Sequence, residues 1–232
     1  MAAPTRAADM TPAPSYYPAA PLPPARYNWT GLYGGGNIGA GLLSDNVSQT
    51  GGNPTVTLAG PIQVGPVGLV GGAQVGFNYQ IASWVFGAEA SWNSSAVTGN
   101  GMTSTVVPAN EQERANSETG WFASATGRVG YADSALLLYV KGGAAELHVT
   151  YTQDVLNGGI VASTQVIGDN RTGFTAGVGL EYGMTENLSA LFEYDFYDFG
   201  SKTYNFTQTP VSIRSNLNTL TVGLNYRFNW AQ

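Results

Sequence analysis

The decisive stretch runs Arg171-Thr-Gly-Phe-Thr-Ala-Gly-Val-Gly-Leu-Glu-Tyr182 and, after a short turn, Leu188-Ser-Ala-Leu-Phe-Glu-Tyr-Asp-Phe-Tyr197. Both halves alternate between apolar side chains, such as Val178, and small or polar ones, such as Glu181. A period of two predicts a β-hairpin with one apolar face. The other face is rich in Gly, Ser and Thr with few acids, which favours a narrow, enclosed polar interior with lipid against the apolar face.

The composition of the 232-residue chain supports this interpretation. Charged residues make up 10% of the chain, against about 25% in soluble domains. The longest apolar run, 135–140, is far shorter than the ~20 residues of a membrane helix, so any crossing must use strands. The net charge of −6 argues against a nucleic-acid partner, and the absence of Cys excludes disulfides, thiolate metal sites and Cys nucleophiles.

The alternation predicts eight strands joined by connections of two sizes. The strands are expected near 29–42, 69–80, 84–96, 117–131, 135–152, 169–183, 188–203 and 214–229. Three connections are tight, at 81–83, 132–134 and 183–187, and four are long, at 43–68, 97–116, 153–168 and 204–213. This plan predicts an all-β fold: an eight-stranded antiparallel transmembrane β-barrel with long extracellular loops and short periplasmic turns.

The predicted barrel spans residues 29–229, between two other segments. Residues 1–28 hold seven of the twelve prolines and are interpreted as a Pro/Ala-rich disordered periplasmic tail, of which 1–8 are a processing remnant or cloning scar. Residues 230–232 form a C-terminal extension. Both termini are therefore expected in the periplasm.

Charged residues of the strands fall on the inward parity: Glu89, Arg128, Lys141, Glu181, Glu193, Asp195 and Arg227. With four acids and three bases, this set is interpreted either as the lining of a small pore for ions or small solutes, or as a plug of paired charges. The plug is favoured, because side chains fill the interior of an eight-stranded barrel and isolated charges are costly there.

Two details of this interior remain open in the sequence. Arg128 and Lys141 are expected to lie diagonally across the turn at Asp133, held together by nearby acids. Glu146 has the opposite parity to Lys141, so either a β-bulge lies at Gly142 and its neighbour or Glu146 lies above the lipid; the second is favoured.

Outward aromatic residues are interpreted as interfacial girdles rather than as a ligand-stacking set; they are Trp84, Trp92, Trp121, Tyr131, Tyr182, Tyr226 and Phe228. Trp84 and Trp92 lie eight residues apart on one face. At a tilt of ~40° they are separated by roughly 20 Å along the membrane normal, which approaches the ~25 Å apolar band of such barrels.

His148, the single histidine, has three interpretations: a rim residue, which is favoured, an axial hemin ligand, or the base of a lipid-modifying hydrolase. An acidic cluster near the second long connection is interpreted as a solvated face rather than a divalent-cation site; it comprises Glu111, Glu113, Arg114 and Glu118. No cofactor or metal site is predicted.

The long connections are not expected to be simple coil. Two alternating runs, 149–156 and 160–167, flank Asn157-Gly158, which is a strong hairpin signal. They predict a ribbon that continues beyond the membrane. Residues 55–58 and 62–70 are expected to form similar extensions.

Four motifs carry a family resemblance: Tyr27-Asn-Trp-Thr-Gly-Leu-Tyr-Gly-Gly-Gly-Asn-Ile-Gly39, Gly127-Arg-Val-Gly-Tyr131, Gly173-Phe-Thr-Ala-Gly-Val-Gly-Leu-Glu-Tyr182 and Leu220-Thr-Val-Gly-Leu-Asn-Tyr-Arg-Phe228. In this order they resemble the small outer-membrane proteins of alphaproteobacteria, which belong with opacity-protein and OmpA-type eight-stranded barrels. The resemblance implies an outer-membrane location and a terminal aromatic read by the barrel-assembly machinery, here Phe228 or Trp230. It also implies roles in envelope structure, hemin binding or surface adhesion.

We therefore expect a non-enzymatic outer-membrane protein with a structural and surface-interaction role through its extracellular loops. The alternatives are a small pore, a hemin or other ligand receptor, and a self-assembling surface protein. Expected partners are outer-membrane lipid and lipopolysaccharide, the barrel-assembly machinery, and a host or surface ligand or a second copy at the loops.

Overall fold

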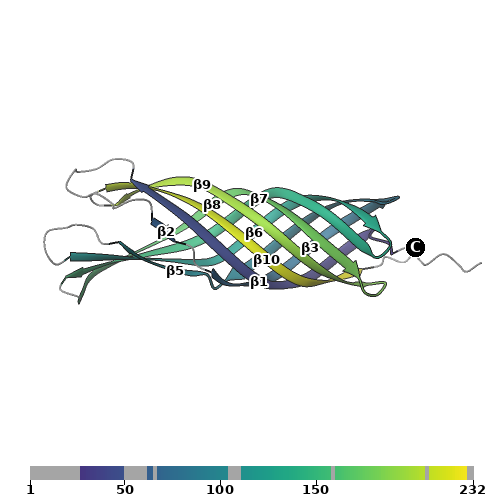
Figure 1. Cartoon of the computed structure of the whole chain (residues 1–232), viewed down its shortest axis with the longest axis horizontal. Helices are drawn as coiled ribbons and strands as arrows, with labels where there is room; N and C mark the ends of the chain where they lie inside the picture. Colours follow the sequence, from purple (N-terminus) through teal and green to yellow (C-terminus); the bar gives the residue numbers. More distant parts are fainter. Residues whose placement is uncertain are drawn as a thin grey trace, which may run out of the picture.

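The computed structural model describes residues 27–49, 62–64, 67–103, 111–157, 160–206 and 209–228. Within these ranges the strands are β1 (Gly31–Gln49), β2 (Ile62–Val64), β3 (Val67–Ile81), β4 (Trp84–Ser95), β5 (Thr98–Thr103), β6 (Glu111–Asp133), β7 (Leu136–Asn157), β8 (Ile160–Gly183), β9 (Leu188–Phe206) and β10 (Thr209–Phe228). Eight long strands pair antiparallel in the order β1, β3, β4, β6, β7, β8, β9, β10, and β10 pairs with β1 (Figure 1). The predicted eight-stranded closed barrel is confirmed.

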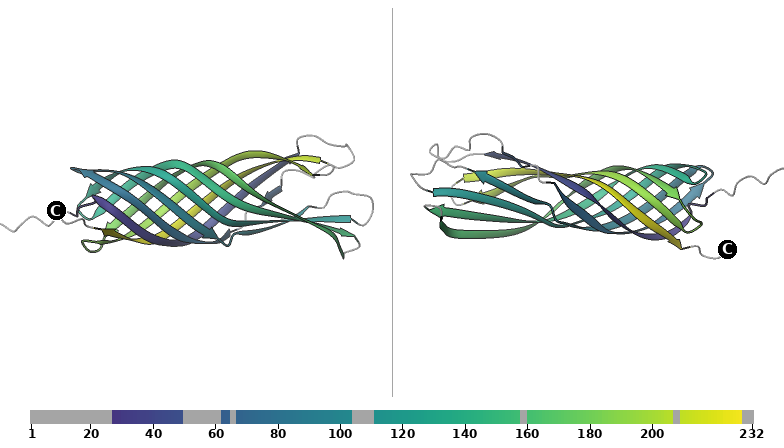
Figure 2. Two further views of the ribbon diagram at one scale, coloured as in Figure 1. Left: turned by 180° about the vertical axis from the view of Figure 1, so that it is seen from behind. Right: turned by 60° about the horizontal axis from the view of Figure 1, so that its bottom comes forward.

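The two ends of the barrel differ. One end, the turn end, carries the short turns after β3, β6 and β8; Ala82 and Ser134 adopt positive φ values of 54° and 55° in two of them. At the other end, the loop end, the strands run on and diverge (Figures 1 and 2). Short β5 pairs with β6, and short β2 pairs with β1.

The strands at the loop end extend further than the sequence predicted. β7 continues to Asn157 and β8 begins at Ile160, in agreement with the predicted ribbon, and β6 already begins at Glu111. The expected extension at 62–70 is seen in part, as β2 and the start of β3, whereas 55–58 lies outside the described residues. The wall therefore continues as ribbons beyond the closed barrel.

The barrel wall divides between β8 and β9. Their described pairing runs from Gly183 and Ser189 to Phe174 and Asp198, although both strands continue towards the loop end. Beyond that point side chains bridge the strands: Lys202 Nζ lies 2.5 Å from Asp169 Oδ1, and Arg171 Nη2 donates to the Gly200 carbonyl at 2.8 Å. Because the backbone pairing between β8 and β9 ends there, the loop end consists of two groups of paired strands. One group is β5 to β8, and the other is β9, β10, β1 and β2.

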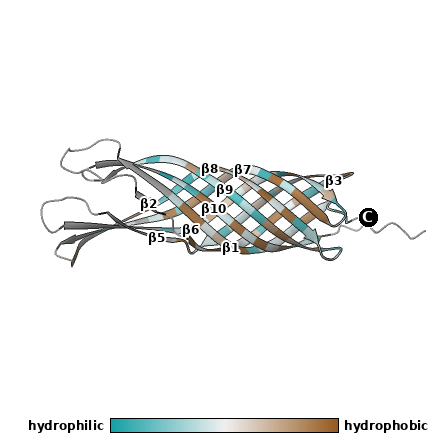
Figure 3. Cartoon of the chain, in the orientation of Figure 1, coloured by the Kyte–Doolittle hydropathy of each residue, from teal (hydrophilic) through white to brown (hydrophobic). Residues whose placement is uncertain are grey.

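The outer face of the closed barrel is apolar. Along β4 and β10 alternate side chains such as Phe86, Trp92, Leu220 and Leu224 are about half exposed, and Figure 3 shows hydrophobic patches spread over the wall. Among the described residues no helix is long and apolar enough to cross a membrane. This face is the one that the alternation assigned to lipid.

The register of β6 against β7 decides between the two interpretations of Glu146. The β6–β7 pairing is unbroken from Trp121 opposite His148 down to the turn, so the alternative of a bulge near Gly142, which was not favoured from the sequence, is excluded. The bulge of this pair lies instead between Thr119 and Trp121. Glu146 has the outward parity and lies further towards the loop end than Lys141. The glycine-rich β1, whose register the sequence specified weakly, pairs continuously with β3 and β10.

Candidate functional site

Lys141 lies at the centre of the charged interior. Its Nζ is 3.3 Å from Glu89 Oε1, 3.0 Å from Glu193 Oε1 and 3.2 Å from Asp195 Oδ2. These acids come from β4 and β9, and the inward parity of each strand directs them to the barrel axis. One ammonium group thus joins three carboxylates from opposite parts of the wall.

Arg128 forms a second centre next to Lys141. Its guanidinium lies between two tyrosine rings, 4.5 Å from the Tyr33 centroid and 4.9 Å from the Tyr139 centroid. Its terminal nitrogens are 3.5 Å from Glu89 and 3.5 Å from Glu181. Cation–π contact and ion pairing therefore compensate a charge that is 3% exposed.

Arg128 and Lys141 lie directly opposite each other in the β6–β7 register, so the predicted diagonal arrangement is wrong. The turn is centred on Ser134 and Ala135, because Asp133 pairs with Leu136, whereas the sequence placed it around Asp133. The acids between the two cations offset the repulsion that direct cross-strand like charges produce.

The two tyrosines were missed in the sequence. The Tyr33 hydroxyl donates to Glu89 Oε2 at 2.7 Å, and the Tyr139 hydroxyl donates to Glu193 Oε1 at 2.6 Å. Both have the inward parity of their strands, which is the signal that could have identified them. The two side chains lie over Gly76 and Gly179, where an added Cβ would meet the Tyr33 hydroxyl at 2.2 Å and a Tyr139 ring carbon at 2.3 Å.

Glu181 is held by neutral donors as well as by Arg128. Its Oε1 accepts hydrogen bonds from the Ser189 hydroxyl and from Asn225 Nδ2 at 3.1 Å. Asn225 Oδ1 in turn accepts from Gln74 Nε2 at 2.9 Å. This chain of hydrogen bonds extends the charged network across β8, β9, β10 and β3.

Arg227, also predicted to join the charged network, lies at the turn end instead. Its guanidinium stacks over Tyr27 at 4.6 Å and Trp29 at 4.8 Å and donates to the Asn28 carbonyl. Burial raises the pKa of the Tyr27 hydroxyl, so this ring stays neutral beside the cation. Tyr27 and Asn28, which the sequence assigned to the tail, therefore contact the barrel.

Apolar clusters close both ends of the polar interior, which the sequence had suggested to be polar throughout. The turn-end cluster contains Trp29, Val85, Ala132, Leu137 and Tyr139, with Tyr27 packed against it. The loop-end cluster contains Leu43, Val70, Val97, Phe122, Ala145, Leu147, Tyr197, Phe199 and Leu217.

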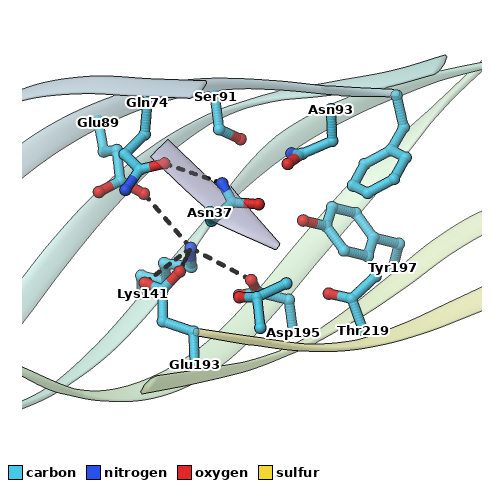
Figure 4. Close-up of a pocket in the computed structure, with 12 residues that line it drawn as sticks. Asn37, Gln74, Glu89, Ser91, Asn93, Lys141, Glu193, Asp195, Tyr197 and Thr219 are labelled. Carbon is cyan, nitrogen blue, oxygen red and sulfur yellow. Dashed lines mark hydrogen bonds and ion pairs between the residues drawn. The ribbon is translucent and has the colours of Figure 1, made fainter. Parts of the chain in front are cut away.

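A small cavity lies between the charged network and the loop-end cluster (Figure 4). Measured as the volume open to the centre of a water molecule, it is about 10 Å³. That is room for about one water-sized particle. The lining is mostly polar and includes Asn37, Asn93, Lys141, Asp195 and Tyr197.

The residues interpreted as aromatic girdles all lie on the outward parity. Six of them are about half exposed: Trp84, Trp92, Tyr131, Tyr182, Tyr226 and Phe228. Trp84 packs edge-on against Tyr131 near the turn end, at a centroid distance of 5.8 Å. Trp121 is partly buried, and Trp92 and Trp121 lie nearer the loop end.

His148 belongs to this outer face. Its ring stacks on Trp121 at 5.7 Å, and Nδ1 lies 2.6 Å from Asn170 Oδ1. Within the described ranges no group of His, Cys, Asp or Glu is arranged to hold a metal ion. Of the acidic cluster at 111–118, the Glu118 side chain is exposed, and the other side chains lie outside the described ones.

Comparisons with known proteins agree with the barrel geometry. The family model "Outer membrane protein beta-barrel domain" matches residues 17–228. The 31 kDa outer-membrane immunogenic protein of Brucella melitensis is 31% identical over 220 residues, which cover 91% of this chain and 89% of that protein. The 22 kDa outer membrane protein of Rhizobium leguminosarum is 28% identical over 161 residues, which cover 69% and 67%.

Among solved structures, OprG of Pseudomonas aeruginosa aligns with 87% of this chain and 97% of its own, at 11% identity and a TM-score of 0.49. The sequence relatives carry the assignment. Since the family model matches residues 17–228, which include the whole described barrel, and a relative that is 31% identical covers 91% of the chain, the chain belongs to the outer membrane protein beta-barrel domain family, as its resemblance to alphaproteobacterial small outer-membrane proteins predicted.

Proposed function

We propose that this protein is a non-enzymatic structural and surface-interaction protein, in which a sealed barrel anchors the loop end at the cell surface. The sealed interior is the observation that supports this proposal most. Two apolar clusters enclose a network of paired charges, and the cavity between them measures about 10 Å³. A continuous path for hydrated ions needs far more space than one water molecule.

The loop end is proposed to face outward, with the turn end and both termini in the periplasm. Long outer loops and short periplasmic turns are the usual arrangement of such barrels. The Brucella melitensis relative is named an immunogenic protein, which fits a loop end that meets the host. Proposed partners are lipid and lipopolysaccharide around the wall, the barrel-assembly machinery, and a surface ligand at the ribbons.

The sealed interior is tested by single-channel recording in planar bilayers. The refolded protein, with folding verified by a heat-dependent gel shift, is expected to give no steady current. The physical reason is that ions would have to shed water to cross two apolar layers. A general porin inserted under the same conditions is the positive control. Steady openings whose conductance rises with salt would contradict the proposal and favour a small pore.

The orientation is tested by labelling intact cells, since the native chain contains no Cys. Ile160, at the start of β8, is 76% exposed at the loop end, and Glu186 is exposed in the turn after β8. Ile160→Cys is expected to react with a membrane-impermeant maleimide on intact cells. Glu186→Cys, the matched control, is expected to react after permeabilisation alone. The reverse pattern would overturn the orientation.

The division between β8 and β9 favours self-association as a second candidate. The β8–β9 pairing ends at Phe174 and Asp198, and beyond it side chains such as Arg171 and Lys202 bridge the two strands. A strand edge whose pairing to its neighbour ends is a template for pairing with another chain. Light scattering in mild detergent distinguishes the candidates: a dimer or larger species supports self-association, and a strictly monomeric particle rules it out.

A further inference from the structure

A polar patch borders the apolar outer wall on β6, β7 and β8. In the strand register Trp121, His148 and Asn170 lie side by side, one on each strand. The Trp121 and His148 rings are 6° from parallel, and His148 Nδ1 lies 2.6 Å from Asn170 Oδ1. Glu146 lies two residues before His148, on the same face of β7. These four residues are termed the wall patch.

The wall patch begins where the apolar part of the wall ends. Outward residues of β7 are apolar or small from Leu136 up to Glu146 and polar from there onwards, and on β8 the same change lies between Phe174 and Thr172. Glu146 lies ten residues beyond Leu136, which at ~3.3 Å per residue and a tilt of ~40° is roughly 25 Å along the membrane normal. Lipid chains cover an apolar band of about that height, so the rest of the patch lies at the level of the lipid headgroups.

Two glycines flank the Nε2 edge of the His148 ring. An added Cβ at Gly120 would lie 3.5 Å from Cδ2, and one at Gly168 would lie 3.9 Å from Cε1. These are the two ring carbons bonded to Nε2, so no side chain from either position covers it. Since Asn170 Oδ1 can only accept a hydrogen bond, Nδ1 carries the proton, and Nε2 of the neutral ring is an acceptor. The amide nitrogen of Asn170, which is exposed, is a donor beside it.

The charges around the wall patch favour a sugar over a phosphate group. The described outward side chains of β6, β7 and β8 near the patch include two acids, Glu118 and Glu146, and no Lys or Arg. Across the division between β8 and β9, Arg214 is paired with Asp198 at 2.6 Å. Phosphate-bearing headgroups are bound by clusters of basic residues. Sugar hydroxyls, in contrast, donate to carboxylate and imidazole acceptors, and the apolar face of a sugar ring packs against aromatic rings.

We propose that the wall patch binds a sugar ring of the lipopolysaccharide in the surrounding outer leaflet. The sugar packs against the Trp121 and His148 pair, its hydroxyls donate to His148 Nε2 and to Glu146, and Asn170 Nδ2 donates to a sugar oxygen. The inference rests on the proposed outward orientation of the loop end, because lipopolysaccharide is the lipid that carries sugars at that level. It assigns a site to one of the proposed partners.

The test is lipid binding to the folded protein in dodecylphosphocholine, a detergent without a sugar, measured by native mass spectrometry. Rough lipopolysaccharide is expected to bind at a dissociation constant about tenfold or more below that of phosphatidylglycerol, which has a phosphate but no sugar ring. Dephosphorylated lipopolysaccharide is expected to bind as tightly as the untreated form. Equal affinity for phosphatidylglycerol, or a loss of affinity on dephosphorylation, would overturn sugar recognition.

Gly168→Val is expected to weaken lipopolysaccharide binding about tenfold, because it covers the Nε2 edge of His148. Gly127→Val is the matched control, since it adds the same side chain to the apolar wall on β6, where the nearest atom to an added Cβ is a backbone oxygen at 4.0 Å. It is expected to bind like the native protein. Equal affinity in the two variants would overturn the site.

Trp121→Ala removes a ring that packs against the sugar and is expected to weaken binding by a similar factor, with folding verified by the heat-dependent gel shift. Binding in micelles does not depend on orientation, which the maleimide labelling of Ile160→Cys tests separately. Unspecific binding together with the expected labelling would overturn the site alone. Reversed labelling would place the patch against the other leaflet and overturn both proposals.

Discussion

Arg128 is the residue on which most of the interior converges. It contacts the faces of two tyrosines whose hydroxyls bind acids that Lys141 also holds. Removing the guanidinium would leave Glu181 without its cation, would leave Glu89 with Lys141 alone, and would open a gap between the rings. The effect should therefore exceed that of losing an exposed ion pair of similar geometry.

The first prediction compares two arginines. Arg128→Ala is expected to lower the free energy of unfolding by about 3–5 kcal/mol, because breaking a buried pair leaves its partner unpaired. Arg214→Ala removes a cation whose side chain is 53% exposed and which pairs with Asp198 at 2.6 Å; its expected cost is about 0–1 kcal/mol. Urea titration monitored by the heat-dependent gel shift measures both. Equal losses would contradict a central role for Arg128.

Parity in the sequence was sufficient to direct the seven predicted charges inward, since a strand alternates strictly between its two faces, but the buried Arg171 and Asp198 were missed. It was not sufficient to identify contacts. Tyr139 shares the parity of Lys141, yet its bond to Glu193 depends on how far β9 is displaced along the barrel relative to β7. Arg227 was likewise predicted to point into the barrel, but its position along the barrel axis was not predicted. It lies at the turn end, beside Tyr27 and Trp29.

At the scale of the strands, the inward side of a single strand changes from apolar to charged and back to apolar along its length. On β7 the inward positions run from Leu137 and Tyr139 through Lys141 to Leu147 and Val149. Sequence periodicity that assigns polar residues to the inside misses these apolar ends. The parity of a residue determines whether it points into the barrel, but not its position along the barrel axis. The three turns were predictable in number and approximate place, although the β6–β7 turn is shifted from Asp133 to Ser134 and Ala135. The outer ends of the strands depend on pairing beyond the membrane.

The ribbon of β7 and β8 supplies the second prediction. Their pairing continues from Thr152 opposite Val166 to Asn157 opposite Ile160, beyond the end of β8–β9 pairing. Replacing residues 154–164 with Asn-Gly, a two-residue hairpin turn, is expected to leave barrel stability within about 0.5 kcal/mol, as for surface changes away from the core. Urea titration of the shortened protein checks this. Loss of the heat-dependent shift would show that the ribbon helps to fold the barrel.

At the scale of the whole molecule, the described residues form three layers of side chains in series along the barrel axis. The loop-end cluster, the charged network and the turn-end cluster each close the interior with side chains from several strands. The plug that we propose would differ in this respect from a channel closed by a single gate. A channel opens when its one gate is removed, whereas a plug with three layers does not.

The third prediction follows from this series. The double substitution Phe122→Ala and Leu147→Ala removes two large side chains from the loop-end cluster, in which both are 1% exposed. The folded variant is expected to remain silent in a planar bilayer, because the charged network and the Trp29 cluster still block the path. Recovery of folded protein from the bilayer vesicles is the control. Steady currents would identify the loop-end cluster as the single barrier.

The contact of Arg227 with Tyr27, Asn28 and Trp29 joins the two ends of the described barrel. Arg227 is the penultimate residue of β10, and Trp29 precedes β1, so this contact requires nearly the entire barrel sequence to have been made. A chain released before β10 lacks the Arg227 guanidinium that stacks over the Trp29 ring, so that face of the ring stays exposed. Full burial of Trp29 therefore indicates that the last strand has been incorporated into the barrel.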